Sequence, residues 1–439
     1  MKIAVIGAGI SGLSSAWQLS RAGHDVSLYE AGDYFGGHTN TVDIELEGQR
    51  FGVDTGFLVF NHRTYPNLVR LFNELQVHTT ASDMSFAVKM PIRSGSNGTR
   101  MLEWAGSNLV TVFAQRRNLF DARFLRMLKD ILRFNRETTQ MAQVPGAMEE
   151  IPLGDFLDQH HYSSEFRDWY LLPMAGCIWS CPTAQMLAFP LATFVRFCHN
   201  HGLIQVSDRP QWHTVTGGAR HYVQKMLSEI AHTYLATPVQ DVTRISNGTL
   251  QQVRVESTLG SKTYDHVVLA THSDQTLDLL QDASADERAL LSAVAYQPNH
   301  AVLHTDARCL PERRKAWSAW NYESAGDAAG ETRVCVHYLL NKLQPLPVQT
   351  PVIVSLNPIH DIDPAKVLAR FDYAHPVFDG PAIEAQRALV DIQGMRNTWF
   401  AGAWTGYGFH EDGLKSGLSV AAAIDALAQQ ASLPGLMAA

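Results

Sequence analysis

The sequence lacks a long uninterrupted apolar run. No stretch reaches the ~18 uncharged apolar residues that a membrane-spanning helix requires. The opening segment MKIAVIGAGISGL has a lysine followed by apolar residues, but Gly7, Gly9 and Gly12 interrupt the apolar core that a signal peptide would need. We therefore expect a cytoplasmic protein, with peripheral contact at the inner membrane face as the alternative.

Cysteine is scarce as well. Five cysteines in 439 residues is an odd number, which suits reduced thiols in the cytosol better than a disulfide framework. Cys177 and Cys181, with Cys198, His199 and His201 nearby, raise the alternative of a metal site. The Cys-x3-Cys spacing is not that of the usual zinc sites, and buried free cysteine is common, so we predict no metal.

The chain also lacks a basic excess. Its 35 lysines and arginines against 43 aspartates and glutamates give a formal net charge of -8. A nucleic-acid-binding surface normally leaves a basic balance, so we expect no nucleic-acid partner. What remains is 46% hydrophobic and 18% charged residues, an ordinary globular composition in a chain long enough for two domains.

The first informative motif opens the chain. Residues 3–6, IAVI, form a β-branched run typical of a buried parallel strand, and GAGISG, which includes Ser11, follows directly. Gly7 permits a tight turn, Gly9 lets the backbone approach a pyrophosphate, and Gly12 lets the next helix pack on the strand. The helix LSSAWQLSRAG would then point its first amide groups at the phosphates.

A second strand, DVSLYE, ends at Glu30 and is followed by Ala31. A carboxylate in this place accepts hydrogen bonds from the ribose hydroxyls of an adenosine, and it would repel the 2′-phosphate of NADP. NAD and FAD both remain open from this pattern. Strand, glycines, helix, second strand and acid in this order predict a dinucleotide-binding domain; the alternative is a glycine turn without a ligand.

Motifs further along resemble those of the flavin amine oxidase superfamily, which includes monoamine oxidases, protoporphyrinogen oxidases and phytoene-type desaturases. AGDYFGGHTNT places Gly36 and Gly37 beyond the acid like the family's Gly-Gly-Arg turn, with His38 where arginine is usual. FGVDTGFLVF supplies, at Gly56 and Phe57, the turn that the family brings to the flavin.

The resemblance extends over nearly the whole chain. VTGGARHYVQKML resembles the family's Gly-Gly segment before a helix, and TPVQDVTRI the strand whose residue near Val239 covers the adenine. YDHVVLATHSDQTLDLL resembles the strand that returns to the nucleotide fold. In FAGAW, Gly402 belongs to the last buried strand, and EDGLKSGLSVAAAI would place Asp412, Gly413 and Leu414 against the flavin and its pyrophosphate. The resemblance implies one FAD, held non-covalently because these motifs contain no cysteine.

A narrower resemblance rests on WNY, LNKLQPLP, SLNP, YAHPVFD, IQG and GFHEDGL. These segments are similar to a bacterial group of predicted FAD-binding oxidoreductases, often linked to cyclopropane-synthase-like fatty-acid methyltransferases and in some cases to desaturation of methylated acyl chains. This implies a dehydrogenase or desaturase of an apolar, acyl-chain or lipid-like substrate. A flavin-containing amine oxidase is the alternative, and a protein that binds FAD only for structure or electron transfer is a third.

The motif map implies an α/β fold with the two-domain architecture of the amine oxidases. Residues 1–80, 208–285 and 390–432 would form a discontinuous Rossmann-like FAD-binding domain, and 81–207 and 286–389 an α+β substrate-binding domain. Residues 81–207 read as mostly helical, whereas HAVLHT, ETRVCVHYLL and PVIVSLN read as strands of a mixed sheet. The oligomeric state, the electron acceptor and the exact substrate stay open.

One helical stretch, residues 116–136, stands out by its charge. On a helical wheel one face carries Arg126, Lys129, Arg133 and Arg136, and the other carries Phe120, Phe124, Leu128 and Ile131. Two interpretations remain: an amphipathic surface helix packed on the core, or an interfacial helix that rests on anionic lipid.

His410 and Glu411 are the candidate proton acceptors, because histidine titrates near neutrality and the pKa of a buried carboxyl can be raised. By resemblance, His375 falls near one position of the family's aromatic cage at the flavin, and Phe409 or His410 near the other. The alternatives are a His410 that only hydrogen-bonds, a His375 that shapes a turn, and helix capping by Glu411 and Asp412. Lys342 is the candidate for the lysine that many amine oxidases keep beside the flavin.

Overall fold

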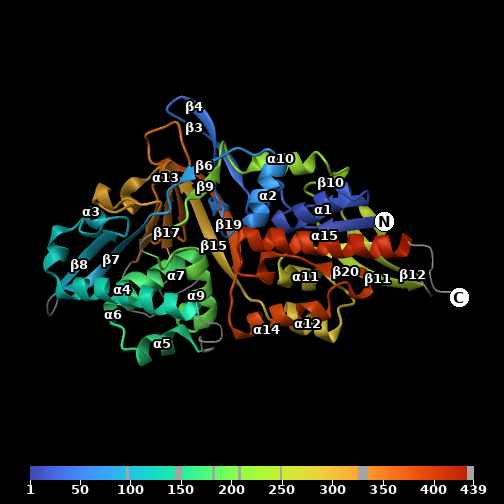
Figure 1. The fold of residues 1–439 in the computed structure, drawn as a ribbon. Coiled ribbons are helices and arrows are strands. Elements are labelled where there is room, and N and C mark those ends of the chain that lie inside the picture. Colours follow the sequence, from blue (N-terminus) through green and yellow to red (C-terminus); the bar gives the residue numbers. More distant parts are fainter. Residues whose placement is uncertain are drawn as a thin grey trace.

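The structure is a computed structural model that describes residues 1–94, 98–143, 151–179, 183–205, 209–247, 250–324 and 335–432. Figure 1 shows two lobes, and the N-terminus lies on the right-hand one. Among the described helices, none is both long and apolar enough to cross a membrane.

A five-stranded parallel sheet forms the centre of the first lobe, which we call the parallel-sheet lobe. Its inner strands are buried almost throughout, as expected for apolar runs covered on both faces. All five strands come from the three segments assigned to the nucleotide domain. In order across the sheet they are β10 (His232–Tyr234), β2 (Asp25–Tyr29), β1 (Lys2–Ile6), β14 (His266–Leu269) and β20 (Thr398–Phe400).

Two helices from opposite ends of the chain pack together on this sheet. They are α1 (Ile10–Arg21) and α15 (His410–Ser432), and Figure 1 shows α15 crossing the lobe beside α1. The two backbones approach so closely at Gly417 that a Cβ there would lie 2.2 Å from the Ser11 carbonyl oxygen. The shorter helices of this lobe are α2 (Pro66–Glu74), α10 (Arg220–Leu227), α11 (Ser273–Leu279), α12 (Ala285–Leu291) and α14 (Gly380–Ala388).

A seven-stranded mixed sheet forms the second lobe, the mixed-sheet lobe. Only the β16–β7 pair is parallel among the pairings of its described strands. In order they are β19 (Val367–Pro376), β15 (Tyr296–His304), β18 (Ile353–Leu356), β17 (Cys335–Leu339), β16 (Trp320–Glu323), β7 (Phe86–Ser94) and β8 (Gly98–Ala105). The α/β class and the two-part architecture expected from the sequence are confirmed.

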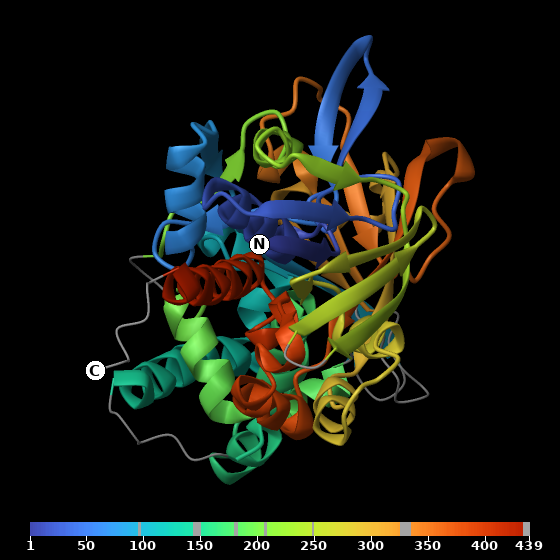
Figure 2. The same cartoon turned by 90° about the vertical axis from the view of Figure 1, so that its right-hand side faces the viewer.

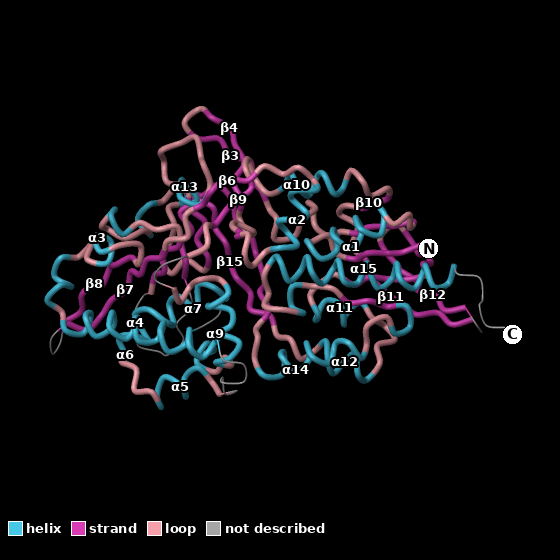
Figure 3. Tube along the Cα trace, viewed as in Figure 1, coloured by secondary structure: helices cyan, strands magenta, loops and turns pink. Residues whose placement is uncertain are grey.

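The helices between α4 and α9 gather on one side of the mixed-sheet lobe, as Figure 3 shows. They form their own core around Phe134, Phe166 and Phe194, all fully buried. Their bounds are α4 (Ala122–Gln143), α5 (Leu153–Gln159), α6 (Ser164–Phe166), α7 (Leu172–Trp179), α8 (Thr183–Leu187) and α9 (Leu191–Asn200).

The start of the 81–207 segment departs from the helical expectation. It forms the hairpin β7–β8, because β7 pairs in parallel with the distant strand β16 and so becomes an inner strand of the sheet. Helix α4 begins at Ala122, so Phe120 is not on its apolar face. Phe120 instead ends a 3-10 turn, η1 (Arg116–Phe120), and its side chain is 90% exposed.

Three small sheets connect and flank the lobes. The hairpin β3 (Thr41–Leu46) and β4 (Gln49–Asp54) projects from the body in Figures 1 and 2. Beside the parallel sheet lies a second small sheet of β11 (Val239–Asn247), β12 (Leu250–Ser257) and β13 (Gly260–Tyr264). The third consists of β5 (Phe60–Asn61), β9 (Trp212–Val215) and β6 (Thr79–Ser82).

Candidate active site

A cavity of about 680 Å³ is lined by residues of both lobes. One end is formed by the loops that follow β1, β2 and β14, the carboxyl edge at which open parallel sheets bind ligands. The other end reaches the mixed sheet at Trp320, Tyr338 and Val354. The cavity therefore joins the predicted nucleotide site to the predicted substrate site.

The glycines after β1 have two different roles: one leaves open space at the cavity, and another lets α1 pack closely on the strand. A Cβ on Gly9 would meet no protein atom within 4 Å, and Gly9 lines the cavity. A Cβ on Gly12 would lie 1.8 Å from the Gly7 carbonyl oxygen, so Gly12 lets α1 pack on the strand. Gly9 is also the N-cap of α1 and supplies no side-chain cap, which leaves the first amides of the helix for an anion.

Glu30 follows β2 and is held in place by backbone amides. Its carboxylate accepts hydrogen bonds from Ala8 N–H and Gly32 N–H, both at 2.8 Å, and the residue lines the cavity. Each carboxylate oxygen keeps a further lone pair, so a ribose diol can bind to it.

The glycine turn after Glu30 lies directly against the first one. A Cβ on Gly37 would approach Gly9 Cα to 3.1 Å, and a Cβ on Gly56 would approach the His38 carbonyl oxygen to 2.2 Å. Chain packing alone therefore requires glycine at position 56, and it leaves little room for a side chain at position 37. The cavity lining includes these predicted cofactor residues: Gly7, Gly9, Ser11, Glu30, Ala31, Gly36, Gly37, His38, Gly56, Phe57, Val239 and Gly402.

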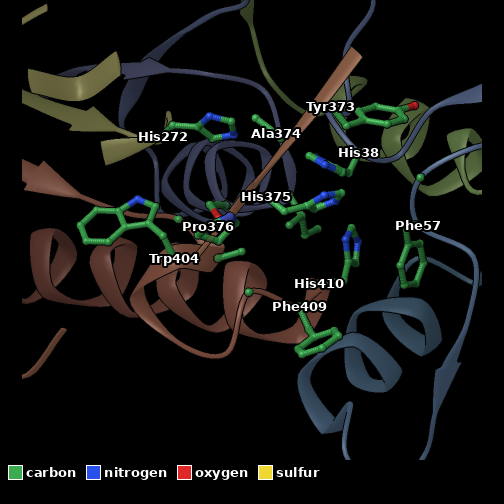
Figure 4. A pocket seen from close by; sticks show the side chains of 18 of the residues that line it. His38, Phe57, His272, Tyr373, Ala374, His375, Pro376, Trp404, Phe409 and His410 are labelled. Atoms are coloured by element: carbon green, nitrogen blue, oxygen red, sulfur yellow. The ribbon is translucent and has the colours of Figure 1, made fainter. Parts of the chain in front are cut away.

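Three histidines point toward the middle of the cavity (Figure 4). The ring of His38 stacks on Tyr373 at 4.8 Å and lies 5.2 Å from the ring of His375. The ring of His410 stacks on Phe57 at 3.9 Å. His38 Nε2 is buried and has no partner among the described residues, so the pocket holds a polar group that a ligand can satisfy.

Burial keeps these rings neutral. It lowers the pKa of His375 to about 4 and that of His410 to about 3, and the pKa of His38 also falls well below its usual value. The Asn299 side-chain amide donates to His375 Nδ1 at 2.8 Å, so the proton of the neutral His375 ring lies on Nε2. His410 Nε2 lies 2.8 Å from the Tyr222 hydroxyl, which lies 2.6 Å from Thr39 Oγ1.

Glu411 does not reach the cavity. Its carboxylate accepts hydrogen bonds from Asn67 N–H, the Asn67 amide and Leu68 N–H at 2.8 to 3.0 Å, and so caps the N-terminus of α2. This capping contact argues against Glu411 as the proton acceptor.

Asp412, Gly413 and Leu414 also lie outside the cavity lining. Asp412 accepts from Phe409 N–H at 3.0 Å, and burial raises its pKa to about 6. Gly413 packs against Ile10, and Leu414 is fully buried in the core. The structure therefore assigns this turn to helix packing, while the neighbouring His410 faces the site.

The mixed-sheet half of the cavity is apolar and aromatic. Among the described residues that line the whole cavity, the only charged side chains are Glu30 and Asp278, both on the parallel-sheet lobe. The mixed-sheet lobe and its helices contribute Met84, Ile178, Trp179, Phe197, His201, Leu203, Trp320, Tyr338, Val354 and Leu356. This half is suited to an uncharged, apolar molecule.

Two earlier candidates lie elsewhere. Lys342 does not line the cavity, and its ammonium pairs with Asp83 at 3.1 Å on the surface. Of the cysteines considered for a metal, Cys177 and Cys198 are buried free thiols, and Cys181 lies outside the described residues.

Sequence reasoning did not select Tyr373, Trp404 or His272, which also line the cavity. The sequence contains a motif that could have identified each of these three residues. Tyr373 lies in YAHPVFD, Trp404 in FAGAW, and His272 follows the strand VVLAT at the carboxyl edge of the parallel sheet, where ligands bind.

Known proteins share both sequence and fold with this chain. The family model described as flavin containing amine oxidoreductase matches residues 10–340. Over 77 residues the chain is 39% identical to 15-cis-phytoene desaturase of Synechococcus elongatus, a match covering 18% of this chain and 15% of that protein. The curated relatives that it matches are covered over 14% to 56% of their own length.

Two solved structures superpose on nearly the full chain. Cyclohexylamine oxidase from Brevibacterium oxydans IH-35A has a TM-score of 0.66 at 17% identity, covering 98% of this chain and 99% of that one. A CLA-producing fatty acid isomerase from P. acnes has a TM-score of 0.63 at 15% identity, covering 98% of each chain. At these identities the similarity shows a shared fold.

Proposed function

The chain belongs to the flavin containing amine oxidoreductase family, and from that premise we propose that it is an oxidoreductase that dehydrogenates an apolar, acyl-chain or lipid-like substrate. Its cofactor is FAD. When bound, FAD supplies the acceptor for the hydride equivalent that leaves a C–H bond.

The residues present fit this cofactor. The open space at Gly9, the uncapped first amides of α1 and the carboxylate of Glu30 match a pyrophosphate followed by a ribose. Among the described residues no cysteine lines the cavity, which supports non-covalent binding.

The proposed substrate class rests on the chemistry of the side chains in the mixed-sheet half of the cavity. It presents aromatic and aliphatic side chains and, among the described residues, no carboxylate, lysine or arginine. Burying an ionised group there would cost several kcal/mol without a partner, whereas apolar surface gains about 25 cal/mol per Å² buried. An acyl chain suits such a chamber better than a charged metabolite.

Proton handling in the site falls to His375 and His410. Both rings are neutral near pH 7, so each has one unprotonated nitrogen and one N–H. His410 is linked through the Tyr222 hydroxyl to Thr39, a chain of groups that both donate and accept. We assign the uptake of a proton to His410. His375, whose Nδ1 already accepts from Asn299 and whose Nε2 carries the proton, positions the reacting C–H bond.

An amine oxidase is the second candidate, and one observation favours it. Trp320, Tyr407 and Phe409 line the cavity, and a neutral amine can bind between aromatic rings. The similarity to cyclohexylamine oxidase concerns the fold.

The experiment that separates the two candidates is anaerobic reduction of the bound flavin. A panel of saturated and methyl-branched fatty acyl chains is compared with cyclohexylamine. Bleaching by the acyl panel alone supports the proposal, and bleaching by the amine alone assigns the protein to the second candidate.

Contact with a lipid surface is a further part of the proposal, supported by the end of the mixed-sheet lobe that bears α3 (Leu109–Val112) and α4 (Figure 1). Six large apolar side chains are exposed there: Leu109, Val110, Leu119, Phe120, Leu125 and Leu132. The cations Arg126, Lys129 and Arg136 lie exposed on the same helix as Leu125 and Leu132. Apolar side chains beside cations are the combination that anionic membrane surfaces bind.

A further inference from the structure

A buried polar cluster lies on the face of the mixed sheet that points away from the cavity. Side chains alternate between the two faces of a strand. Trp320, Tyr338 and Val354 line the cavity, so their neighbours in β16, β17 and β18 point to the other face. Those neighbours include Glu323, Cys335, His337 and Ser355, which are between 0% and 2% exposed.

Three of these side chains bring ligand atoms together. One carboxylate oxygen of Glu323, the Cys335 sulfur and one ring nitrogen of His337 all lie within 4.8 Å of one another. Glu323 Oε2 is 3.0 Å from His337 Nε2, and Cys335 Sγ is 3.4 Å from the same nitrogen. A second, overlapping group joins His337 to His304 and Cys309.

We propose that this cluster is a binding site for a thiophilic divalent cation, with Zn²⁺ as the matching ion. Bonds of ~2.3 Å to sulfur and ~2.0 to 2.2 Å to nitrogen and oxygen, arranged tetrahedrally, give ligand-to-ligand separations of about 3.3 to 3.6 Å. The separations of 3.0 and 3.4 Å in the cluster therefore need little adjustment to hold the ion. A thiolate, an imidazole and a carboxylate all belong to the zinc ligand set.

The surroundings suit a metal-bound histidine. His337 Nδ1 lies 2.6 Å from Ser355 Oγ. With the ion bound, this oxygen would accept the Nδ1 proton and leave Nε2 for the ion. His304 Nε2 also lies 2.6 Å from this oxygen, and His304 Nδ1 accepts from Asp306 N–H at 3.0 Å. Two imidazole N–H groups thus converge on the two lone pairs of one hydroxyl oxygen.

Charge balances with the ion bound. Lys89 Nζ binds Glu323 Oε1 at 2.7 Å, which leaves Oε2 facing His337. With the ion bound, Glu323 and the thiolates of Cys335 and Cys309 offset the two charges of Zn²⁺ and the one of Lys89. The sulfur of Cys309 belongs to the overlapping group around His337 and not to the Glu323–Cys335–His337 group, so it would have to move closer to serve as a fourth ligand.

The test uses the full-length flavoprotein, freed of metal by a chelator and then titrated with Zn²⁺ alone. We expect one equivalent to bind with Kd below about 1 µM, a free energy of about -8 kcal/mol. Co²⁺ in place of Zn²⁺ should give tetrahedral d–d bands, at wavelengths longer than the flavin absorbs, and a thiolate charge-transfer band in the difference spectrum. Cys335→Ser and Glu323→Gln should each weaken binding by more than tenfold, and Ser355→Ala by about ten- to a hundredfold.

The matched control is Cys198→Ser, which removes a buried thiol from α9 outside the cluster. It should leave Zn²⁺ affinity unchanged, and retained FAD absorbance in each variant shows that the protein has folded. If Cys335→Ser does not fold, Cys309→Ser, at a partly exposed position, takes its place. Failure of the metal-free parent to bind a stoichiometric ion, or equal losses in Cys198→Ser and Cys335→Ser, would overturn the site. Neither outcome bears on FAD binding or substrate oxidation.

Discussion

At the scale of single residues, cofactor binding depends most on Glu30. Two backbone amides fix its carboxylate, so the side chain is already ordered before a ribose arrives. Binding to a preorganised acceptor loses less conformational entropy than binding to a mobile one.

Glu30→Ala should weaken FAD retention about tenfold to a hundredfold, because a charge-assisted hydrogen bond contributes about 1.5 to 3 kcal/mol. The measurement is FAD released on dialysis, followed by flavin fluorescence. Glu30→Gln, which keeps an acceptor for one amide, should lose less, and the exposed Glu45→Ala is the control. A Glu30→Ala protein that retains FAD as tightly as the parent does would remove Glu30 as the ribose ligand.

His375→Ala and His410→Ala should each slow flavin reduction by about 100-fold while FAD stays bound. Since burial holds both pKa values near 3 to 4, the reduction rate of the parent should not change with histidine titration between about pH 6 and 8. Single-turnover reduction under anaerobic conditions measures both effects. Glu411→Gln is the matched control, since it removes a cap of α2 and should change stability more than rate. Parental rates in both histidine variants would exclude these rings from the chemistry.

The residues that the sequence predicts well are those whose role is local. Gly7, Gly9 and Gly12 act within one strand, turn and helix, so their spacing is sufficient to assign them. Glu411 is different, because its partners Asn67 and Leu68 lie far away in the sequence. The residues next to Glu411 in the sequence contain nothing that indicates that its carboxylate caps another helix.

At the scale of elements, the α1–α15 contact holds the phosphate-binding turn in place. Gly417→Ala should destabilise the protein by about 1 to 3 kcal/mol, because the new Cβ would lie 2.2 Å from both the Ser11 carbonyl oxygen and Ser14 Oγ. Displacement of α1 should also weaken FAD binding. Thermal unfolding and FAD titration report the two effects.

Gly106→Ala is the control for this substitution, since Gly106 does not have a left-handed φ and a Cβ there would meet only Trp104 Cζ3, at 3.9 Å. It should change stability by less than about 1 kcal/mol. Equal behaviour of the two alanine variants would contradict the close packing of α1 on α15.

The lipid-surface prediction concerns the exposed face of α4. Changing Arg126, Lys129 and Arg136 to glutamine should abolish cosedimentation with anionic vesicles, because each cation near such a surface contributes about 1 kcal/mol. Added salt should weaken parental binding. Arg133 belongs to the same predicted set but is engaged by Glu137 at 2.9 Å and its side chain is 30% exposed, so Arg133→Gln should matter less. Arg126 also pairs with Glu165, at the longer distance of 3.6 Å, and its side chain is 57% exposed.

Phe120→Ser tests the apolar part of the same surface, since burying a phenylalanine contributes about 1.5 to 3 kcal/mol. The matched control for the α4 variant without Arg126, Lys129 and Arg136 instead changes three exposed cations of the parallel-sheet lobe to glutamine. These are Arg254, Lys262 and Arg288. Equal cosedimentation of the parent and the α4 variant would leave only the interpretation of a packed surface helix.

The elements that the sequence misplaces depend on distant partners. β7 forms because β16, far along the chain, pairs with it. The periodicity of residues 116–136 predicts that Phe120 lies on a helix. Asp121 instead ends the 3-10 turn before α4 begins, and its carboxylate accepts from Arg123 N–H at 2.9 Å. Local patterns describe helices and strands once they exist, whereas sheet neighbours decide which segments become strands.

At the scale of the whole molecule, three separate chain segments build one parallel sheet and two build one mixed sheet. The sequence predicts this division because each nucleotide-fold segment carries its own motif. The shape and polarity of the chamber between the sheets could not be predicted, since its lining comes from many residues distant in the sequence. The cavity therefore supports the proposed substrate class, and the motifs indicate the cofactor.

The most direct test of the central claim is single-turnover reduction of the bound flavin by a panel of fatty acyl chains under anaerobic conditions. We expect the protein to release FAD on denaturation and its flavin absorbance to bleach with an acyl substrate. Cyclohexylamine should leave the absorbance unchanged. A flavin that the amine bleaches and every acyl chain leaves oxidised, or a colourless protein that takes up NAD and refuses FAD, would contradict it.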